Sequence, residues 1–284
     1  MMHSPPTHSP LAHSPPTRSP LTHAAQNTAK PTTLLLLPGL ACDHELFAPQ
    51  LPALQGWADA ARAALVVSTA HARANTLPSM ARLLLAEHPQ GELLLAGCSM
   101  GGMLAFELQR QAPQRVRGLA LLGTSARPDT PELIALRTKA CLMFAEGRTN
   151  EILEANVFFA FHPTHTRDRA MVRRYLDMLH RAGPQQLIHQ NRAVMARVDS
   201  RPGLPLINVP AVVACGEADG LTTPDVAREM AALLPQARLE LLPGAGHMLT
   251  WEQPQRVTAL LLDWLQAVMQ GPAPATSSAA APAG

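Results

Sequence analysis

Apolar segments of four to seven residues recur along most of the chain and alternate with amphipathic stretches. We expect the apolar segments to form buried strands at residues 33–37, 64–68, 93–96, 116–122, 211–214 and 239–242. Helices are expected between them, near residues 46–54, 77–88, 103–108, 224–234 and 254–268. Because such strands have apolar side chains on both faces, the sequence predicts an α/β fold with a mainly parallel sheet flanked by helices.

The alternation stops after about residue 127. From there to residue 198 the sequence shows no convincing strand pattern. It shows four helical patterns instead, at residues 131–146, 150–161, 167–181 and 184–197. We therefore expect a helical cap at residues 128–205, inserted between two strands of a core that comprises residues 32–127 and 206–270.

The two ends of the chain have compositions that do not suit a packed core. Residues 1–31 are rich in Pro, Ser, Thr and His, and residues 3–7 are repeated at 13–17. Residues 271–284 consist mainly of Ala, Pro and Ser. Such sequences bury too little apolar surface to fold, so we expect both ends to be disordered. The N-terminal segment also lacks the apolar stretch of a secretory signal.

The overall composition allows a large core and narrows the class of partner. Hydrophobic residues make up 47% of the 284 residues, and the formal charge is only +2, with both signs mixed along the chain. No apolar run reaches the ~20 residues of a membrane span. The four cysteines lie far apart, so they suggest neither a zinc site nor a disulfide framework. We expect a cytoplasmic protein with no nucleic-acid or membrane partner.

One segment carries a motif with chemical meaning. The expected strand at residues 93–96 runs into Gly97-Cys98-Ser99-Met100-Gly101-Gly102, a Gly-x-Ser-x-Gly pattern that is followed by helix-forming residues. Strand, sharp turn and helix are the context of a nucleophile elbow, which holds the serine hydroxyl out above the sheet. Glycines suit this turn because a Cβ there would collide with neighbouring backbone. We therefore predict that Ser99 is a nucleophile.

A serine nucleophile needs a general base, because its hydroxyl is almost entirely protonated near neutral pH. His247 follows a late apolar strand in a Gly-rich loop that can approach the serine, and we predict that it is this base. His44 follows the first strand closely, but an early-loop histidine better suits the wall of a substrate pocket. The expected cap contains four more histidines that could contact substrate, at positions 162, 165, 180 and 189.

The base in turn needs an acid that fixes its tautomer. Asp219 follows an expected strand and precedes His247, so we predict that it has this role. Glu217 is the next candidate. Asp129, which follows an earlier strand, is another. Asp225 lies in the first turn of an expected helix, where an acid complements the helix dipole.

The same geometry calls for an oxyanion hole. The backbone N–H of Met100, directly after the serine, is the first expected donor, and the N–H of Leu40 in the loop after the first strand is the second. Both would stabilise negative charge that develops on a carbonyl oxygen. Such donors are worth roughly 3–4 kcal/mol each in comparable sites.

These motifs resemble those of the α/β-hydrolase superfamily, in its branch with a helical cap. Residues 97–102 match that branch's G-x-S-M-G-G elbow, Gly216-Glu217-Ala218-Asp219 its G-x-x-D acid loop, and Gly246-His247 its closing G-H. The order Ser, Asp, His is the family's own, and the resemblance covers residues 32–268. The first loop departs from the family, which often has His-Gly where this chain has Pro38-Gly39-Leu40.

The resemblance implies an α/β-hydrolase fold and acyl transfer to water through an acyl-enzyme on Ser99, with no metal or organic cofactor. It fits esterases and enol-lactonases about equally, so the expected partner is a small-molecule ester or lactone. Carbon–carbon bond hydrolases, cofactor-free haloperoxidases, acyltransferases and non-catalytic binding proteins on this scaffold stay open as alternatives. The residues expected in the substrate pocket are His44, Phe144, Phe158 and Phe159. For the phenylalanines, packing of the cap onto the core is the competing role.

Overall fold

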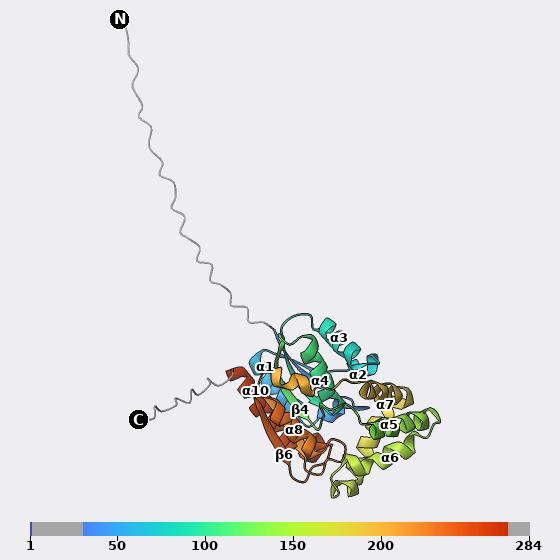
Figure 1. Cartoon of the computed structure of the whole chain (residues 1–284). Helices are drawn as coiled ribbons and strands as arrows, with labels where there is room; N and C mark the ends of the chain where they lie inside the picture. The colour runs from blue at the N-terminus through green and yellow to red at the C-terminus, as the bar shows by residue number, and fades with distance from the viewer. Residues whose placement is uncertain (2–30, 272–284) are drawn as a thin grey trace, which may run out of the picture.

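The computed structural model describes Met1 and residues 31–271, and residues 31–271 form a parallel sheet covered by helices (Figure 1). The disorder expected at the ends concerns mainly residues 2–30 and 272–284, which lie outside the described residues. The strands are β1 (Thr32–Leu37), β2 (Ala64–Val67), β3 (Glu92–Cys98), β4 (Val116–Leu122), β5 (Ala211–Gly216) and β6 (Ala237–Leu242). They lie in the order β2-β1-β3-β4-β5-β6, and every neighbouring pair is parallel. The predicted fold class is confirmed.

Each face of the sheet has its own hydrophobic core. Leu34 and Leu36 of β1 belong to one core, whereas Leu35 and Leu37 belong to the other. All four are fully buried. Successive side chains of a strand point to opposite faces, so a strand buried on both faces requires a continuous apolar run. This is the pattern from which the sequence predicted the strands.

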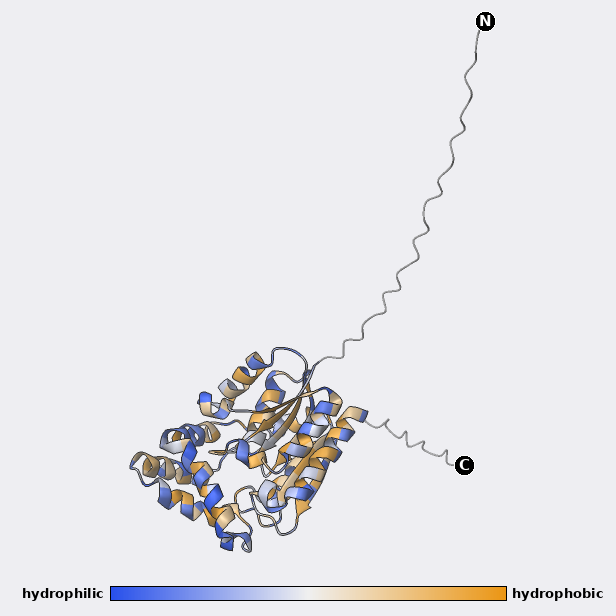
Figure 2. Ribbon diagram, turned by 180° about the vertical axis from the view of Figure 1, so that it is seen from behind, coloured by the Kyte–Doolittle hydropathy of each residue, from blue (hydrophilic) through white to orange (hydrophobic). Residues whose placement is uncertain are grey.

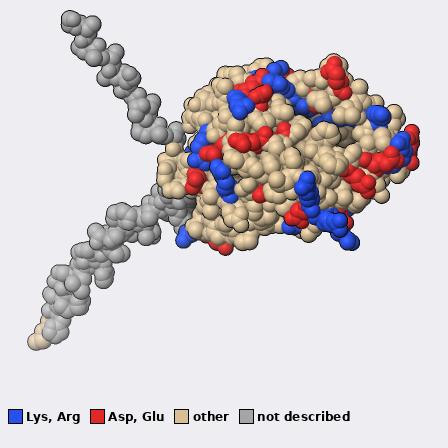
Figure 3. Space-filling model, turned by 90° about the horizontal axis from the view of Figure 1, so that it is seen from below, with Lys and Arg blue, Asp and Glu red and all other residues tan. Residues whose placement is uncertain are grey.

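Helices close both cores. The helices of the core region are α1 (Leu51–Ala61), α3 (Leu77–Glu87), α4 (Met100–Gln111), α8 (Pro224–Leu233) and α10 (Pro254–Gln270). Buried residues of α1 and α10 belong to the first core, and those of α3, α4 and α8 to the second. Figure 2 shows hydrophobic strands between helices that carry both hydrophobic and hydrophilic residues. On the face shown in Figure 3, positive and negative side chains are interspersed.

Three short elements that the sequence analysis did not separate lie in the loops after strands. They are the 3₁₀-helix η1 (His44–Phe47), α2 (Ala70–Arg73) and α9 (Leu249–Glu252). Each has four residues, too few to show a helical period. No helix within residues 31–271 has the length and apolarity that would let it cross a membrane.

A helical insertion follows β4 and precedes β5. It comprises α5 (Pro131–Ala145), α6 (Thr149–Ala160), η2 (His165–Arg167), α7 (Arg169–Met195) and η3 (Arg201–Leu206). Two of the predicted helices form the two arms of α7, which is interrupted at Gly183 with φ 74° and ψ 165°. A positive φ favours glycine, and Pro184 then starts the second arm.

A buried charge cluster ties the two ends of the insertion together. The carboxylate of Asp129 is 1% exposed and accepts from Arg137 at 2.8 Å and from Arg197 at 2.8 Å. Nearby, the Ser200 N–H donates to the Ala126 carbonyl at 2.9 Å. Asp129 was one of the candidate acids for the base. The structure instead gives it two arginine partners from the insertion.

The insertion also bonds to loops at the carboxyl ends of β1 and β6. The N–H of Met248, just after β6, donates to the Ala160 carbonyl at 3.0 Å. The N–H of Ala41, just after β1, donates to Gln190 Oε1 at 2.7 Å. These bonds place the insertion over the edge of the sheet where parallel strands end, the usual position for ligand sites in open α/β sheets.

Glycines allow the tight junction between β3 and α4. A Cβ at Gly97 would collide with the backbone of Gly101, and a Cβ at Gly101 would collide with the Leu37 carbonyl. At Gly102 it would lie 2.5 Å from the Thr124 side chain. The helix therefore begins in direct contact with β1 and with the segment after β4.

We expect Gly101→Ala to destabilise the protein by ~2 kcal/mol or more, because the added methyl overlaps backbone of β1. Gly56→Ala is the matched control. Gly56 is exposed on α1, where a Cβ meets nothing within 4 Å, so the alanine should stabilise by up to ~1 kcal/mol. Free energies of unfolding from urea titrations test both variants. An undiminished value for Gly101→Ala would contradict the close approach.

Candidate active site

Ser99 lies at the junction of β3 and α4 in an unusual backbone conformation. Its φ is 53° and its ψ is −118°, a combination that non-glycine residues rarely adopt and that costs ~1–3 kcal/mol. The Ser99 N–H donates to the Leu122 carbonyl at 2.9 Å, and the Thr124 hydroxyl donates to the Ser99 carbonyl at 2.6 Å. The residue is partly exposed between two buried neighbours, Cys98 and Met100. The structure therefore has the strained serine turn that the motif predicts.

Asp219 and His247 form a buried pair. The distance between Asp219 Oδ2 and His247 Nδ1 is 2.8 Å, and their side chains are 0% and 9% exposed. Asp219 Oδ1 accepts the backbone N–H groups of Leu221 and Thr222, both at 2.8 Å. The Thr222 hydroxyl donates to Oδ2 at 2.9 Å. Both oxygens of the carboxylate thus have hydrogen-bond partners from the protein itself.

The two groups stabilise each other's charged forms. Burial by itself raises the pKa of Asp219, but the charge and hydrogen bond of His247 and the N–H groups of Thr222 and Leu221 outweigh it, so the net pKa is lowered. Burial lowers the pKa of His247, but the charge and hydrogen bond of Asp219 and the charge of Glu252 leave the net pKa raised. Asp219 is therefore ionised at neutral pH.

An ionised carboxylate can only accept hydrogen bonds, so we assign a proton to His247 Nδ1. Both side-chain hydrogen bonds of His247 within residues 31–271 use Nδ1. In the neutral ring, Nε2 is then an acceptor. Within residues 31–271, Nε2 forms no hydrogen bond with the Ser99 hydroxyl. Bonds between a nucleophile and its base are often long without substrate.

The end of β4 and the residue after it contact both the serine and the Asp219–His247 pair. Leu122 accepts the Ser99 N–H. The next residue, Gly123, has φ 49°, and a Cβ there would lie 3.2 Å from Asp219 Oδ2 and 3.3 Å from His247 Nδ1. Leu122 therefore contacts Ser99, and the next residue, Gly123, contacts Asp219 and His247. The three predicted residues lie near one another at one edge of the sheet, and their catalytic roles stay predictions.

The other acids lie elsewhere. Glu217 is exposed, and Asp225 is paired with Arg228 at 2.7 Å in the first turn of α8. Asp219 is therefore the candidate acid that the structure places against His247.

The predicted oxyanion donors border Ser99 from two sides. Met100 is the first residue of α4, and helices leave their first N–H groups without partners inside the helix. Leu40 lies in a turn closed by a bond from the Cys42 N–H to the Gly39 carbonyl at 3.1 Å. A Cβ at Gly39 would lie 3.3 Å from Ser99 Cβ, so this turn passes directly against the serine. Donation by Leu40 and Met100 stays a prediction.

The predicted pocket residues occupy three different environments. His44 has a side chain that is 70% exposed, and it lies 3.8 Å from the Asp43 carboxylate. Phe144 is 3% exposed and packs within the core that the insertion shares with one face of the sheet. Phe158 and Phe159 are 75% and 54% exposed, and Phe159 lies against Gly220, next to Asp219. A role for any of them in binding stays a prediction.

Glu252 is a site residue that the sequence analysis missed. Its carboxylate is fully buried and accepts the N–H groups of Gly246 and His162, both at 2.7 Å. It also lies 2.9 Å from His165 Nδ1. Glu252 therefore joins the loop of His247 to the insertion. A lone acid at the end of the apolar stretch 248–251 was the only signal for it in the sequence.

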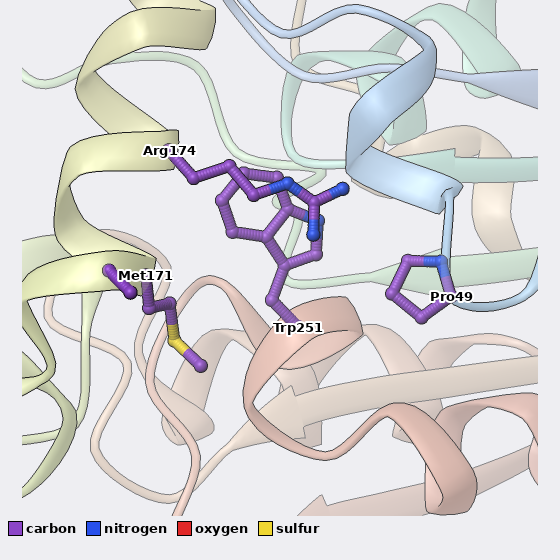
Figure 4. Close-up of a pocket in the computed structure, with 5 residues that line it drawn as sticks. Pro49, Met171, Arg174 and Trp251 are labelled. Atoms are coloured by element: carbon purple, nitrogen blue, oxygen red, sulfur yellow. The ribbon is translucent and has the colours of Figure 1, made fainter.

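A shallow cavity of about 240 Å³ lies outside this arrangement (Figure 4). It is lined by Pro49, Ala170, Met171, Arg174 and Trp251. The Arg174 guanidinium lies 4.6 Å from the centre of the Trp251 ring and donates to Glu45. These contacts fasten α7 to the loops of the core. None of the predicted site residues lines this cavity.

We expect Glu252→Gln to lower the pKa of His247. The negative charge of Glu252 stabilises the imidazolium, although less than the charge of Asp219 does, and the variant removes it. An NMR titration of the His247 ring nitrogens measures this pKa directly. Glu154→Gln, an exposed position on α6, is the control and should leave the pKa unchanged. A His247 pKa at or above the wild-type value in Glu252→Gln would contradict this electrostatic role.

Solved structures of similar shape include several hydrolases. A thermophilic esterase from Thermogutta terrifontis has a TM-score of 0.73 and 26% identity, over 84% of this chain and 91% of the other. The enol-lactonase from Burkholderia xenovorans LB400 has a TM-score of 0.69 and 21% identity, over 85% of this chain and 94% of the other. The second likeness, at this identity, shows the fold alone.

Curated relatives are similar over part of their length. A pimeloyl-acyl-carrier-protein methyl ester esterase from Neisseria meningitidis is 27% identical over 183 residues, which are 63% of this chain and 58% of the relative. The biotin biosynthesis bifunctional protein BioHC from Cellvibrio japonicus is 25% identical over 244 residues, 82% of this chain and 47% of the relative. The chain thus spans less than two thirds of these two relatives.

The family comparison covers most of the chain. The family model described as alpha/beta hydrolase fold matches residues 32–254, which include β1 to β6 and the three predicted site residues. The resemblance seen in the sequence motifs is confirmed. The chain belongs to the α/β-hydrolase fold family.

Proposed function

We propose that the protein is a serine hydrolase that cleaves a small-molecule carboxylic ester or lactone through an acyl-enzyme on Ser99. One observation carries the proposal: a buried Asp219–His247 pair, 2.8 Å apart, lies beside a strained serine turn. This is the arrangement that activates a serine hydroxyl, and it is recognised by geometry and not by position in the chain.

The protonation states support a definite first step. His247 Nε2 takes the proton of the Ser99 hydroxyl while Oγ attacks the ester carbonyl carbon. Nδ1–H remains bonded to Asp219, which stabilises the imidazolium that forms. The carbonyl oxygen becomes an oxyanion, which the N–H groups of Leu40 and Met100 stabilise.

The second half of the reaction uses the same groups in reverse. The carbon–oxygen bond to the alcohol breaks, and the imidazolium gives its proton to the leaving oxygen. Water then attacks the acyl-enzyme, His247 takes a proton from the water, and the carboxylic acid leaves Ser99. The raised pKa of His247 makes the ring a stronger base toward the proton of the serine hydroxyl.

The substrate class rests on the relatives and on exposed apolar side chains. The Neisseria relative is named for a methyl ester on an acyl-carrier protein, and the Thermogutta structure is an esterase. Phe158 and Phe159 present exposed rings, and Phe159 lies beside the Asp219 loop. We therefore propose an ester with an apolar acyl chain, and a methyl ester is the first candidate. The helical insertion acts as the cap over this chain.

We also propose that the protein works in the cytoplasm. Its four cysteines are all buried as free thiols, and burial raises the pKa of Cys42, Cys98, Cys141 and Cys215. Unpaired thiols of this kind suit a reducing compartment.

We expect Ser99→Ala to reduce ester turnover by about four orders of magnitude or more while the fold is kept. A panel of p-nitrophenyl esters of increasing acyl length, together with methyl esters of the same acids, measures turnover. Labelling with a fluorophosphonate probe, located by mass spectrometry, tests whether Ser99 is the activated nucleophile. Ser79→Ala, in the capping box of α3, is the control and should keep wild-type turnover.

The same experiment separates the alternatives. Retention of most activity in Ser99→Ala would contradict the mechanism. Labelling of Ser99 without ester turnover would point to a lactone or a carbon–carbon bond as the reacting group. New esters or amides formed with added alcohols or amines would indicate an acyltransferase. A folded protein with neither labelling nor turnover would be a binding protein on this scaffold.

A further inference from the structure

Gln190 is a fully buried polar residue of the helical insertion that bonds to the core. It lies on the second arm of α7 and has 0% exposure. Its Oε1 accepts the Ala41 N–H at 2.7 Å, and its Nε2 donates to the His71 carbonyl at 2.9 Å. A side-chain amide that is buried with its oxygen and nitrogen both bonded to backbone fixes the position of that backbone.

The backbone that Gln190 contacts is the turn that contains Leu40. This turn is closed by the bond from the Cys42 N–H to the Gly39 carbonyl, and its third residue, Ala41, has φ 60°. A positive φ at the third position corresponds to a type II turn, which normally has glycine or asparagine there. Alanine lacks that preference, so an outside contact must hold the conformation.

Gln190 binds the group that distinguishes the two common turn types. The N–H of Ala41 belongs to the central peptide of the turn, and this peptide faces opposite ways in type I and type II turns. A rotation of that peptide changes ψ of Leu40 and releases the strain at Ala41. It also leaves Oε1 of the buried Gln190 amide without the N–H that it accepts, and an unpaired buried acceptor is unfavourable.

A second bond holds the other end of the turn. His71 Nε2 lies 2.7 Å from the Cys42 carbonyl, so Nε2 carries the proton. Burial lowers the pKa of His71, which keeps the ring neutral. Gln190 in turn bonds to the His71 carbonyl, and α2 lies beside α7 (Figure 1). The insertion, α2 and the turn thus form one closed set of buried hydrogen bonds.

We propose that Gln190 is a positioning residue, which holds the turn so that the Leu40 N–H points at the oxyanion formed at Ser99. This inference rests on the proposed function. It assigns the insertion a part in the reaction itself, besides any contact with the acyl chain. The turn already touches the serine, since a Cβ at Gly39 would lie 3.3 Å from Ser99 Cβ.

The test compares Gln190→Met with Gln185→Met. Methionine has a similar length and no amide, and Gln185 is exposed on the same helix, five residues earlier. We expect Gln190→Met to lower kcat for a p-nitrophenyl ester 10- to 100-fold per active site, counted by fluorophosphonate titration, with KM within about threefold. Gln185→Met should match wild type in both constants.

A trifluoromethyl ketone analogue of the ester isolates the oxyanion. The Ser99 oxygen adds to its carbonyl carbon, the hydroxyl proton passes to His247, and the carbonyl oxygen takes the negative charge. We expect the affinity of Gln190→Met for this ketone to fall by about the same factor as kcat, while affinity for the carboxylic acid product is kept. A purely structural role would lower the melting temperature without this selective loss, and that result would overturn the proposal.

Hydrogen exchange at the Ala41 amide makes the test independent of turnover. We expect exchange at this amide to be faster in Gln190→Met than in wild type and Gln185→Met. Unchanged exchange would overturn the inference even if the proposed function held. If wild type turned over no ester and Ser99 resisted labelling, the proposed function would fail, and the role of Gln190 toward an oxyanion would fail with it. Faster exchange of the Ala41 amide in Gln190→Met would still show that Gln190 holds the turn.

Discussion

The site depends on one buried charge. The Asp219 carboxylate is removed from water, and a buried ionised group is tolerated only when it is paired and hydrogen-bonded. Here two backbone N–H groups, the Thr222 hydroxyl and the His247 ring supply the bonds. Each bond requires a fixed backbone or rotamer, so the loops after β5 and β6 have little freedom left. The orientation of the His247 ring follows from satisfying the acid and needs no contact with Ser99.

Two more buried carboxylates at this edge of the sheet are held by hydrogen bonds or ion pairs. Glu252 has a fully buried carboxylate that joins the His247 loop to the end of α6, and Asp129 has one that joins Arg137 and Arg197 at the base of the insertion. Neutral Gln190 makes the third polar connection, to the turn after β1. A helical insertion bonded at these points is part of the site's support. Truncation of one side chain in such a network leaves its hydrogen-bond partner buried and unpaired, and this lowers the stability of the protein more than the loss of an exposed bond would.

Local patterns account for what the sequence could predict. The predicted strand at residues 116–122 has the same first and last residues as β4, and the predicted helices of the insertion begin and end within one or two residues of the observed helices. This agreement is possible because a buried strand and an amphipathic helix each have a characteristic sequence period. The break at Gly183 was visible as Gly-Pro. Gln190 and Glu252 were not predictable in this way. Gln190 meets Ala41 across 149 positions of sequence, and no spacing rule connects them. The exposure of Phe158 and the burial of Phe144 likewise depend on how the insertion docks, which periodicity does not encode.

Two strained residues lie on the two backbone segments that meet at this site. Ser99 and Ala41 both have positive φ, and Gly39 is the point where their segments touch. Strain of this kind persists only where surrounding bonds over-determine the backbone. For Ser99 those bonds come from Leu122, the last residue of β4, and from Thr124. For Ala41 one comes from the insertion. An oxyanion hole works by having its donors aimed before charge develops, so the rigidity of the turn matters more than its sequence. Under our two proposals, the insertion both covers the acyl chain and, through Gln190, holds the Leu40 donor in place. These proposals imply that an insertion that adapts to a new acyl chain must keep the position of Gln190 on α7, which would couple the choice of substrate to the stabilisation of the oxyanion.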